Sequence, residues 1–281
     1  MIVVNSIQTL QNLLAQHRQM GHKIGFVPTM GNLHQGHLSL VDVAKQHAEI
    51  VVVSLFVNPT QFGPNEDFDS YPRTLDKDCQ MLESRGTDIV FAPSTEEVYP
   101  KWPNITSVNV AELSNHHCGA SRPVFFGGIC TVVSKLFNMV RPDLAVFGEK
   151  DFQQLTIIKR MVVDLNFGID IIGAPIVRED NGLAMSSRNG YLSDSEKEHA
   201  SHIYKTLVWA KDHIESGERD FRQLEIKANA KLSELGFTTD YFNITNQDTL
   251  QLAEENDTQL VILLGCYMGK VRLIDNIQIK L

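Results

Sequence analysis

The fold is indicated most clearly by one stretch of the chain, Lys23-Ile24-Gly25-Phe26-Val27-Pro28-Thr29-Met30-Gly31-Asn32-Leu33-His34-Gln35-Gly36-His37-Leu38. Its first part, Lys23–Pro28, has the apolar composition of a short buried strand, and Pro28 ends the strand because proline has no N–H to donate to a sheet. Apolar residues then recur at helical spacing, at Leu38, Val41, Ala44 and Ala48. A strand that leads through a short loop into a helix is the first half of a strand–helix–strand unit, and such units build parallel sheets.

The same alternation continues along the first half of the chain. Four more short apolar runs are predicted to be buried strands: Ile50–Val57, Asp88–Phe91, Leu144–Phe147 and Asp170–Gly173. A further helical pattern lies among them, formed by Val132, Leu136 and Val140. We therefore predict an α/β fold with a parallel sheet and helices on both faces, and we expect ligands beyond the carboxyl ends of its strands.

The second half of the chain has a different pattern. After a polar turn at Arg178–Gly182, a capping box at Ser193–Glu196 predicts a helix that runs towards Ser216, and another helix is expected at Phe221–Leu235. Three strands are predicted to follow: Thr239–Ile244, Gln259–Tyr267 and Lys270–Leu281. We predict two domains, a sheet domain at residues 1–176 and a smaller α+β lobe at residues 177–281.

Composition and charge argue against several classes of function. Of the 281 residues, 25 are basic and 34 are acidic, and the net charge of -9 opposes an extended nucleic-acid partner. The four cysteines are scattered and form no C-x-x-C pair, so we expect reduced thiols, no zinc site and a cytoplasmic location. Neither a signal peptide nor an apolar run of membrane-spanning length is visible.

The loop after the first predicted strand has the features of a phosphate-binding site. Gly31 and Gly36 allow a ligand to approach the backbone closely, and the next helix directs its N-terminal amides at the loop. His34 and His37 share the first helical turn, so both can hydrogen-bond a triphosphate as pyrophosphate leaves. A P-loop is excluded because His37 stands where its lysine would be. A zinc pair lacks a third ligand, and two surface histidines at a helix end are the plainest alternative.

Two later segments can complete a nucleotide site. Gly148–Asp151 provides Lys150, a mobile point charge suited to phosphate, and Asp151, which can meet a ribose hydroxyl or the lysine; the same residues also fit a helix start. Met185–Arg188 provides two hydroxyls and a guanidinium that can clamp phosphate oxygens, although adjacent serines in loops are often turn formers. Together with the two histidines upstream, this second segment forms a recognisable nucleotidyl-transfer pair.

Further polar side chains occupy connecting loops. Asn58 and Gln61 carry amides that can hold neutral hydroxyls, and Arg122 can meet a carboxylate or a phosphate. Turn chemistry explains these loops equally well. The cluster His116–Cys118 is interpreted as a polar loop, because adjacent side chains point apart and cannot share a metal.

In this order, these segments resemble the pantothenate synthetase family. The resemblance covers most of residues 24–192, and its matching motifs are Pro28–Gly31 with His34 and His37, Phe56–Pro59 with Gln61 and Phe62, Tyr71–Arg73, Arg122–Pro123, Lys135–Asn138, Gly148–Asp151 with Gln153 and Gln154, and Met185–Asn189. It implies a Rossmann-like domain of the H-I-G-H nucleotidyltransferase superfamily, a C-terminal lid lobe, ATP and Mg2+, and a cytoplasmic homodimer.

The resemblance also implies roles for individual residues. His37 would be the catalytic acid, protonating or hydrogen-bonding the departing phosphate, with His34 and Lys150 beside it. Asp78 would contact magnesium. Pantoate would be held by Gln61 and Gln154, with Gln61 also near β-alanine, and Asn58 and Arg122 would be further substrate-binding residues. ATP would lie against Met30, Gly31, Asn32, Leu33, His34, Gln35, Gly36, His37, Gly148, Glu149, Lys150, Asp151, Val177, Met185, Ser186, Ser187 and Arg188.

The implied reaction is the ATP-dependent condensation of pantoate with β-alanine to pantothenate. The pantoate carboxylate attacks the α-phosphorus and pyrophosphate leaves; the amine of β-alanine then attacks the acyl-adenylate and AMP departs. This chemistry needs positioning and charge neutralisation but no nucleophilic side chain, in agreement with the lack of a G-x-S-x-G motif. One departure from the family pattern lies after Arg122, where Phe125 and Gly127 replace a histidine and a basic residue.

Three alternatives remain open at this stage. Another nucleotidylyltransferase of the same superfamily would keep the nucleotide on its product. A fragment resembling an aminoacyl-tRNA synthetase is opposed by the acidic charge balance, while Gln153 and Gln154 favour a small hydroxylated acid. A non-catalytic nucleotide-binding module is opposed by the joint presence of His34, His37, Lys150 and Arg188.

Overall fold

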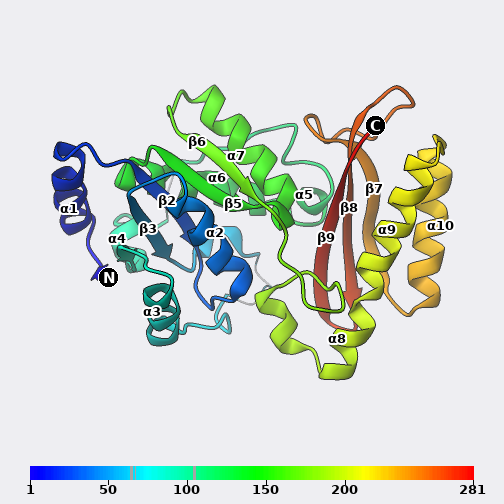
Figure 1. Ribbon diagram of the computed structural model, residues 1–281, viewed down its shortest axis with the longest axis horizontal. Helices are drawn as coiled ribbons and strands as arrows, with labels where there is room; N and C mark the ends of the chain where they lie inside the picture. Colours follow the sequence, from blue (N-terminus) through cyan, green and yellow to red (C-terminus); the bar gives the residue numbers. More distant parts are fainter. Residues whose placement is uncertain (64–65, 67, 104–105) are drawn as a thin grey trace.

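Two separate sheets form the frame of the molecule (Figure 1). The computed structural model describes residues 1–63, 66, 68–103 and 106–281. Within this part of the chain, six parallel strands form the first sheet in the order β1-β4-β3-β2-β5-β6. Their bounds are Ile2–Val4 for β1, Ile24–Thr29 for β2, Ile50–Leu55 for β3, Ile89–Phe91 for β4, Leu144–Gly148 for β5 and Asp170–Ala174 for β6. The predicted α/β class is therefore confirmed, and β1 is an additional short edge strand that the sequence pattern did not reveal.

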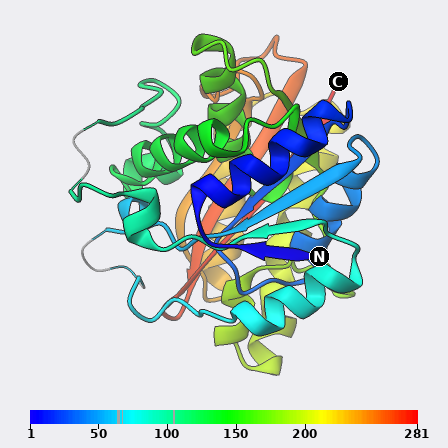
Figure 2. The ribbon, with the colours of Figure 1, turned by 90° about the vertical axis from the view of Figure 1, so that its left-hand side faces the viewer.

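Helices cover both faces of this sheet, because its strands are apolar on both sides. Phe26 and Ala145 pack towards α1 (Ile7–Gln19), α6 (Phe125–Val140) and α7 (Phe152–Asp164). Their neighbours Val27 and Val146 pack towards α2 (Gln35–Lys45) and α3 (Leu75–Ser84). Figure 2 shows α1 and α6 on one side of the strands and α3 on the other. Successive residues of a strand alternate between faces, so a sheet covered on both sides needs continuous apolar runs.

The strand order contains a reversal next to β2. The chain passes from β2 to β3 on one side and later returns as β5 on the other, where Gly25 pairs with Leu144. The loops that leave β2 and β5 therefore begin side by side at the carboxyl edge of the sheet. Such a reversal opens a crevice between the two loops, which is where ligands bind in open α/β sheets.

The second sheet is antiparallel and lies beside the first. It contains β7 (Thr238–Asn246), β8 (Gln259–Met268) and β9 (Val271–Lys280), in that order. The helices α9 (His202–Glu215) and α10 (Phe221–Glu234) cover its outer face, and their apolar residues share one core with it. In Figure 1, β9 faces the parallel sheet while α9 and α10 lie on the far side.

The single helix predicted from Ser193 to Ser216 is wrong in one respect. The capping box is present, with Glu196 donating from its backbone N–H to Ser193 Oγ and Ser193 N–H donating to the Glu196 carboxylate. However, α8 (Asp194–Ala200) ends before α9 begins, with Ser201 between them. The Ser201 hydroxyl donates to the Glu198 carbonyl oxygen at 2.6 Å, a local bond of the kind that competes with helix continuation.

The segment His116–Cys118 is also less polar than expected. The His117 and Cys118 side chains are buried, and short helix α5 (Cys118–Ser121) begins there. One nitrogen of the His117 ring lies 2.9 Å from the Leu250 carbonyl oxygen and the other 2.8 Å from the Asn243 amide nitrogen, and burial lowers the pKa of this histidine. A neutral imidazole satisfies both partners, so His117 joins the two halves of the chain.

Among the described helices, none has the length and apolar composition to cross a bilayer.

Two adjacent glycines of α6 provide a matched test of this packing. A β-carbon on Gly128 would lie 2.3 Å from the Thr60 carbonyl oxygen in η1 (Pro59–Gln61), whereas on Gly127 its nearest neighbour would be Asn109 Oδ1 at 4.0 Å. We expect Gly128→Ala to lower the free energy of unfolding by about 1–3 kcal/mol, because backbone must move. Gly127→Ala should leave it unchanged or raise it by up to about 1 kcal/mol. Urea denaturation of both variants measures this, and equal effects would contradict the packing described.

Candidate active site

Most of the side chains predicted to contact ligands line one cleft at the carboxyl edge of the parallel sheet. Most come from segments that are far apart in the sequence and that follow β2, β3, β5 and β6, whereas Arg122 lies between α5 and α6. The predicted residues that line it are Met30, His34, Gly36, His37, Asn58, Gln61, Arg122, Gly148, Lys150, Asp151, Gln154, Val177, Met185, Ser186, Ser187 and Arg188. Gly31, Asn32, Leu33, Gln35, Glu149 and Asp78 do not line the cleft itself.

The two histidines of the first loop are held in one tautomer. The Gly36 N–H donates to Nδ1 of His34 at 3.1 Å, and the His34 N–H donates to Nδ1 of His37 at 3.4 Å. These bonds form a capping box at the start of α2. Because both Nδ1 atoms act as acceptors, a neutral ring must carry its proton on Nε2. The backbone of the loop therefore sets which nitrogen of each histidine can donate to a ligand.

Burial keeps both histidines neutral. It is the largest cause that lowers the pKa of His34 to about 4, with a further lowering by the nearby Lys150 ammonium. The pKa of His37 falls to about 3, first because of burial and then because of His34 and Lys150. In the free protein His37 is thus a hydrogen-bond donor and not an imidazolium. Of the two roles expected for it at a departing phosphate, hydrogen bonding is the one that this ionisation state supports.

Asp78 anchors the same loop through the backbone. Its carboxylate accepts from the N–H of Asn32 and of Leu33, both at 2.9 Å, and from the Thr74 hydroxyl at 3.1 Å. The loop needs this support because Asn32 has a φ of 50°, in the left-handed region that costs energy for a residue with a side chain. The Asp78 side chain is buried, and these bonds occupy both of its oxygens. Its geometry favours anchoring of the loop over contact with a metal.

Protein ligands for magnesium are sparse around the cleft. In the part of the chain that the structure describes, no group of three His, Cys, Asp or Glu side chains could hold a metal ion. The carboxylate of Asp151 lines the cleft, whereas that of Asp78 does not. Mg2+ in nucleotide sites is usually held by substrate phosphates and one or two carboxylates. The residues present therefore fit an ion that arrives with a nucleotide and meets Asp151.

Gln153 and Gln154, adjacent in the sequence, have different surroundings. Gln153 is buried: its amide donates to the carbonyl oxygens of Leu113 and His116, and its own oxygen accepts from the Cys118 N–H. Gln154 lines the cleft. Gln154 is therefore the better placed of the two to hydrogen-bond a substrate, because these bonds commit the amide of Gln153 to the fold.

The Met185–Arg188 segment is tied directly to the first loop. The Ser187 hydroxyl donates to the Asn32 carbonyl oxygen at 3.2 Å, across 155 positions of sequence. Ser186 caps the short helix η3 (Ser187–Tyr191) by accepting from the Arg188 N–H. Ser186, Ser187, Arg188 and the two histidines line the same cleft.

Asn58 and Gln61, the two amide side chains after β3, have different roles. Asn58 is buried, and its amide nitrogen donates to Gln61 Oε1 at 3.0 Å and to the Gly128 carbonyl oxygen at 3.3 Å. Its oxygen accepts from the Tyr99 hydroxyl at 2.9 Å. These bonds orient Gln61, whose amide nitrogen lies beside Met30 Sδ, a weak acceptor, at 3.2 Å. Gln61 can donate to a ligand, and Asn58 positions it.

Arg122 has a partner that sequence reasoning missed. Its guanidinium donates from Nε to Glu66 Oε1 at 2.6 Å, forms a second short contact to Oε2, and stacks over the Phe125 ring at 3.6 Å. Phe125, which departs from the family pattern, thus supports the arginine. Nothing in the local sequence identifies Glu66, because the pair joins positions 56 residues apart.

Comparison with known proteins gives a consistent result. The family model described as pantoate-beta-alanine ligase matches residues 2–278. The pantothenate synthetase of Marinobacter nauticus is 52% identical over 280 residues, 99% of each chain, and that of Alteromonas mediterranea is 53% identical over 280 residues, again 99% of each. A crystal structure of pantothenate synthetase from Thermus thermophilus superposes with a TM-score of 0.92 at 39% identity and 99% coverage of both chains. A Francisella tularensis pantoate-beta-alanine ligase complexed with beta-gamma ATP and beta-alanine gives a TM-score of 0.81 at 38% identity, covering 99% and 97%.

The tautomers and charges of His34 and His37 can be measured directly. We expect long-range 15N correlation spectra to show the proton on Nε2 of both rings, and no protonation of either between pH 8 and about pH 5, because both pKa values lie near 4 or below. In the urea-unfolded chain the same signals should titrate near 6.5. The unfolded state therefore takes up protons first as the pH falls, so these residues lower the stability below about pH 6.5. A folded-state titration near 6.5 would contradict the burial argument.

Proposed function

The chain belongs to the pantoate–β-alanine ligase family, and we propose that its cleft carries out the ATP-dependent condensation of pantoate with β-alanine through a pantoyl-adenylate. The observation that carries this proposal is the bond between Ser187 and Asn32, which brings the two phosphate-binding loops to face one space. Such a pair of loops can hold a triphosphate along its length. The same space contains Gln61 and Gln154, which fit a small hydroxylated acid.

In the first step, a carboxylate oxygen of pantoate attacks the α-phosphorus of ATP and pyrophosphate leaves. The negative charge on the leaving group is offset by the Lys150 ammonium, the Arg188 guanidinium and the N-terminal amides of α2. The Nε2–H groups of His34 and His37 add neutral donors. Neutral donors suit this place, because they do not repel the lysine that they flank. Mg2+ bound with the phosphates supplies further charge neutralisation.

Pantoate is held on the side of the cleft opposite the triphosphate. Gln61 donates through an amide that Asn58 has oriented, and Gln154 reaches the same space from α7. Arg122 is held by Glu66 and stacked on Phe125, so its charge at the cleft is partly compensated. We assign it to the edge of the pantoate site and not to a phosphate.

In the second step, the neutral amine of β-alanine attacks the acyl carbonyl of the adenylate and AMP leaves with the bonding electrons. The amine loses its extra proton to solvent, and no side chain forms a covalent bond. A second cavity of about 630 Å³ adjoins the cleft and shares Arg122, Lys150 and Gln154 with it. Its other wall is formed by residues of the C-terminal part, such as Tyr241 and Asp275. We propose that residues 177–281 form a lid domain over the sheet domain of residues 1–176, and that this cavity shelters the adenylate from water.

Assembly and location follow the family in this proposal. We infer that the protein acts in the cytoplasm as a homodimer. Analytical ultracentrifugation tests the assembly, and the ligase reaction itself needs no partner beyond pantoate, β-alanine and ATP.

The order of the chemistry tests the proposed function. With pantoate and ATP alone, we expect one burst of pyrophosphate per active site and an adenylate that stays bound. AMP release should begin only when β-alanine is added, because the amine is the nucleophile that frees AMP. Quenched-flow assays of both products measure this. Prompt release of AMP without pantoate would refute the ligase assignment.

Asp78→Asn separates an anchor from a metal ligand. The amide can accept at only one of its two positions, so the N–H of Asn32 or of Leu33 loses its acceptor and the loop loosens. We expect kcat/KM for ATP to fall about 10-fold to 100-fold, because a displaced loop misplaces the histidines. The concentration of Mg2+ for half-maximal rate should stay the same. A large shift in that concentration would instead support a magnesium contact.

A further inference from the structure

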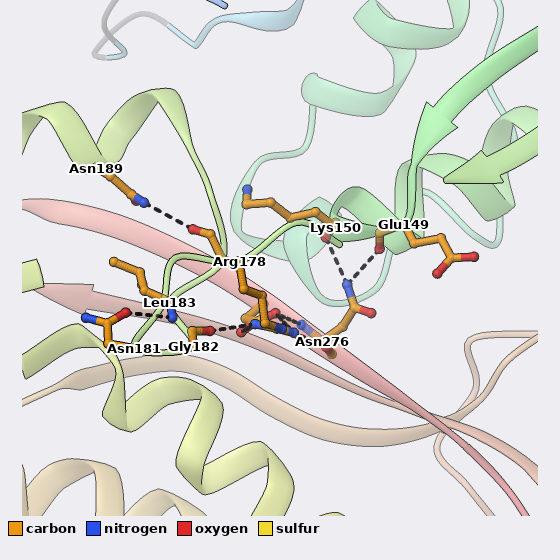
Figure 3. Close-up of polar contacts among 10 residues, drawn as sticks. Glu149, Lys150, Arg178, Asn181, Gly182, Leu183, Asn189 and Asn276 are labelled. Atoms are coloured by element: carbon orange, nitrogen blue, oxygen red, sulfur yellow. Dashed lines mark hydrogen bonds and ion pairs between the residues drawn. The ribbon is translucent and has the colours of Figure 1, made fainter. Parts of the chain in front are cut away.

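One strand of the C-terminal sheet lies between two of the proposed phosphate-binding segments. In its middle, β9 carries Asp275 and Asn276, both buried and both bonded outside their own sheet. Figure 3 shows Asn276 beside the backbone of Glu149 and Lys150. Asn276 reaches the Glu149–Lys150 backbone, and Asp275 reaches Arg178. Neither residue belongs to a motif that identifies the family in the sequence.

The Asn276 amide makes two bonds that no other side chain of its shape could make. Its Nδ2 donates to the carbonyl oxygen of Glu149 at 2.8 Å and to that of Lys150 at 2.9 Å. These two acceptors also settle the orientation of the amide, because a flipped side chain would place oxygen against both carbonyls. Aspartate would do the same, and leucine would leave both carbonyls without this donor. The contact therefore requires asparagine at this position.

This orientation has a cost. Asn276 is 2% exposed, and its own Oδ1 is buried without a hydrogen-bond partner among the described residues. A buried unpaired acceptor lowers stability, and such atoms are rare enough in folded proteins that each one needs an explanation. Stability alone gives a weak account of a residue that satisfies two backbone oxygens and leaves its own oxygen unsatisfied.

Asp275 extends the arrangement to the other segment. Its carboxylate accepts from both terminal nitrogens of Arg178, at 2.7 and 3.0 Å, and from the Asn276 N–H at 2.8 Å. Arg178 stacks on the Tyr204 ring and donates to the Gly182 carbonyl oxygen at 3.0 Å. The backbone of Arg178 forms an isolated antiparallel β-bridge with Ala184, the residue directly before Met185–Arg188. Through Asp275 and Arg178, β9 therefore also holds the chain at the start of Met185–Arg188.

We propose that Asn276 is a positioning residue for the ligase reaction, acting through Lys150. Two donated hydrogen bonds hold the backbone carbonyls before and after the Lys150 α-carbon, so the flexible lysine side chain starts from a fixed point beside the cleft. A reacting or charge-stabilising group displaced by about 1 Å can lose about 100-fold in rate. This inference rests on the proposed function, because it assigns the Lys150 ammonium to the phosphates.

A double-mutant cycle in the full-length protein tests whether Asn276 acts through Lys150. The measurement is the single-turnover rate of pantoyl-adenylate formation with saturating pantoate and ATP. We expect Asn276→Ala to lower this rate about 10-fold and Lys150→Ala about 100-fold or more. The double variant should match Lys150→Ala within about threefold, because the lysine that Asn276 positions is already gone.

Gln278→Ala is the matched control. Gln278 lies on the same strand and donates to the Glu149 side chain at 3.0 Å, but it does not touch the two carbonyls. Its adenylation rate should stay within about twofold of the wild type. If Asn276→Ala does not fold, Asn276→Ser serves in its place, because a water molecule can then replace the lost donor and the direction of the effect is the same.

Two results would overturn the proposal. One is multiplication of the two single effects in the double variant, which would mean that Asn276 acts independently of Lys150. The other is an equal loss in Gln278→Ala, which would mean that any weakening of the β9 contact suffices. Failure of the proposed function looks different, since the wild-type protein would then form no pantoyl-adenylate at all.

Discussion

The site depends on the parallel pairing of β2 with both β3 and β5. Because the chain reverses direction across the sheet at this point, the loops after β2 and β5 begin side by side. One loop supplies His34 and His37 at a helix N-terminus, and the other supplies Lys150. Helix and lysine both favour an anion in the space between them. Two further contacts stabilise this arrangement. Asp78 accepts from the backbone of the first loop, and Ser187 ties the Met185–Arg188 segment to the same loop.

Burial then decides which charges the site can use. The histidines lie too deep, and too close to Lys150, to take up a second ring proton and become positively charged in the free protein. A phosphate that enters the cleft offsets the repulsion from Lys150, since it brings negative charge next to the rings. The site therefore combines the cations of Lys150 and Arg188 with the neutral donors of His34 and His37. This suits a reaction whose first step moves negative charge onto a leaving group.

The sequence predicted the parts of this structure that depend on local patterns. Eight strands, the capping box at Ser193 and the grouping of His37, Lys150 and Arg188 follow from apolar runs, cap chemistry and loop motifs. Partners distant in the chain could not be predicted. Glu66 beside Arg122 looks in the sequence like an ordinary surface acid. The family resemblance implies a magnesium contact for Asp78 but not its bonds to the backbone of Asn32 and Leu33. Their roles exist only after folding brings the two partners together, and no spacing rule encodes such a contact.

The same limit explains why the C-terminal part looked uninformative. Asp275 and Asn276 stand in a strand whose apolar alternation is ordinary, so their polar side chains resemble the exposed half of a strand. In the folded chain both are buried, because β9 lies against the other part of the molecule and not against water. A family motif identifies residues that touch a ligand. A residue that supports them can be identified only in the folded structure, from the carbonyl groups and charged side chains that it contacts. The precision of a site built on loops must come from such supports, since the loops have no regular hydrogen bonding of their own to fix them.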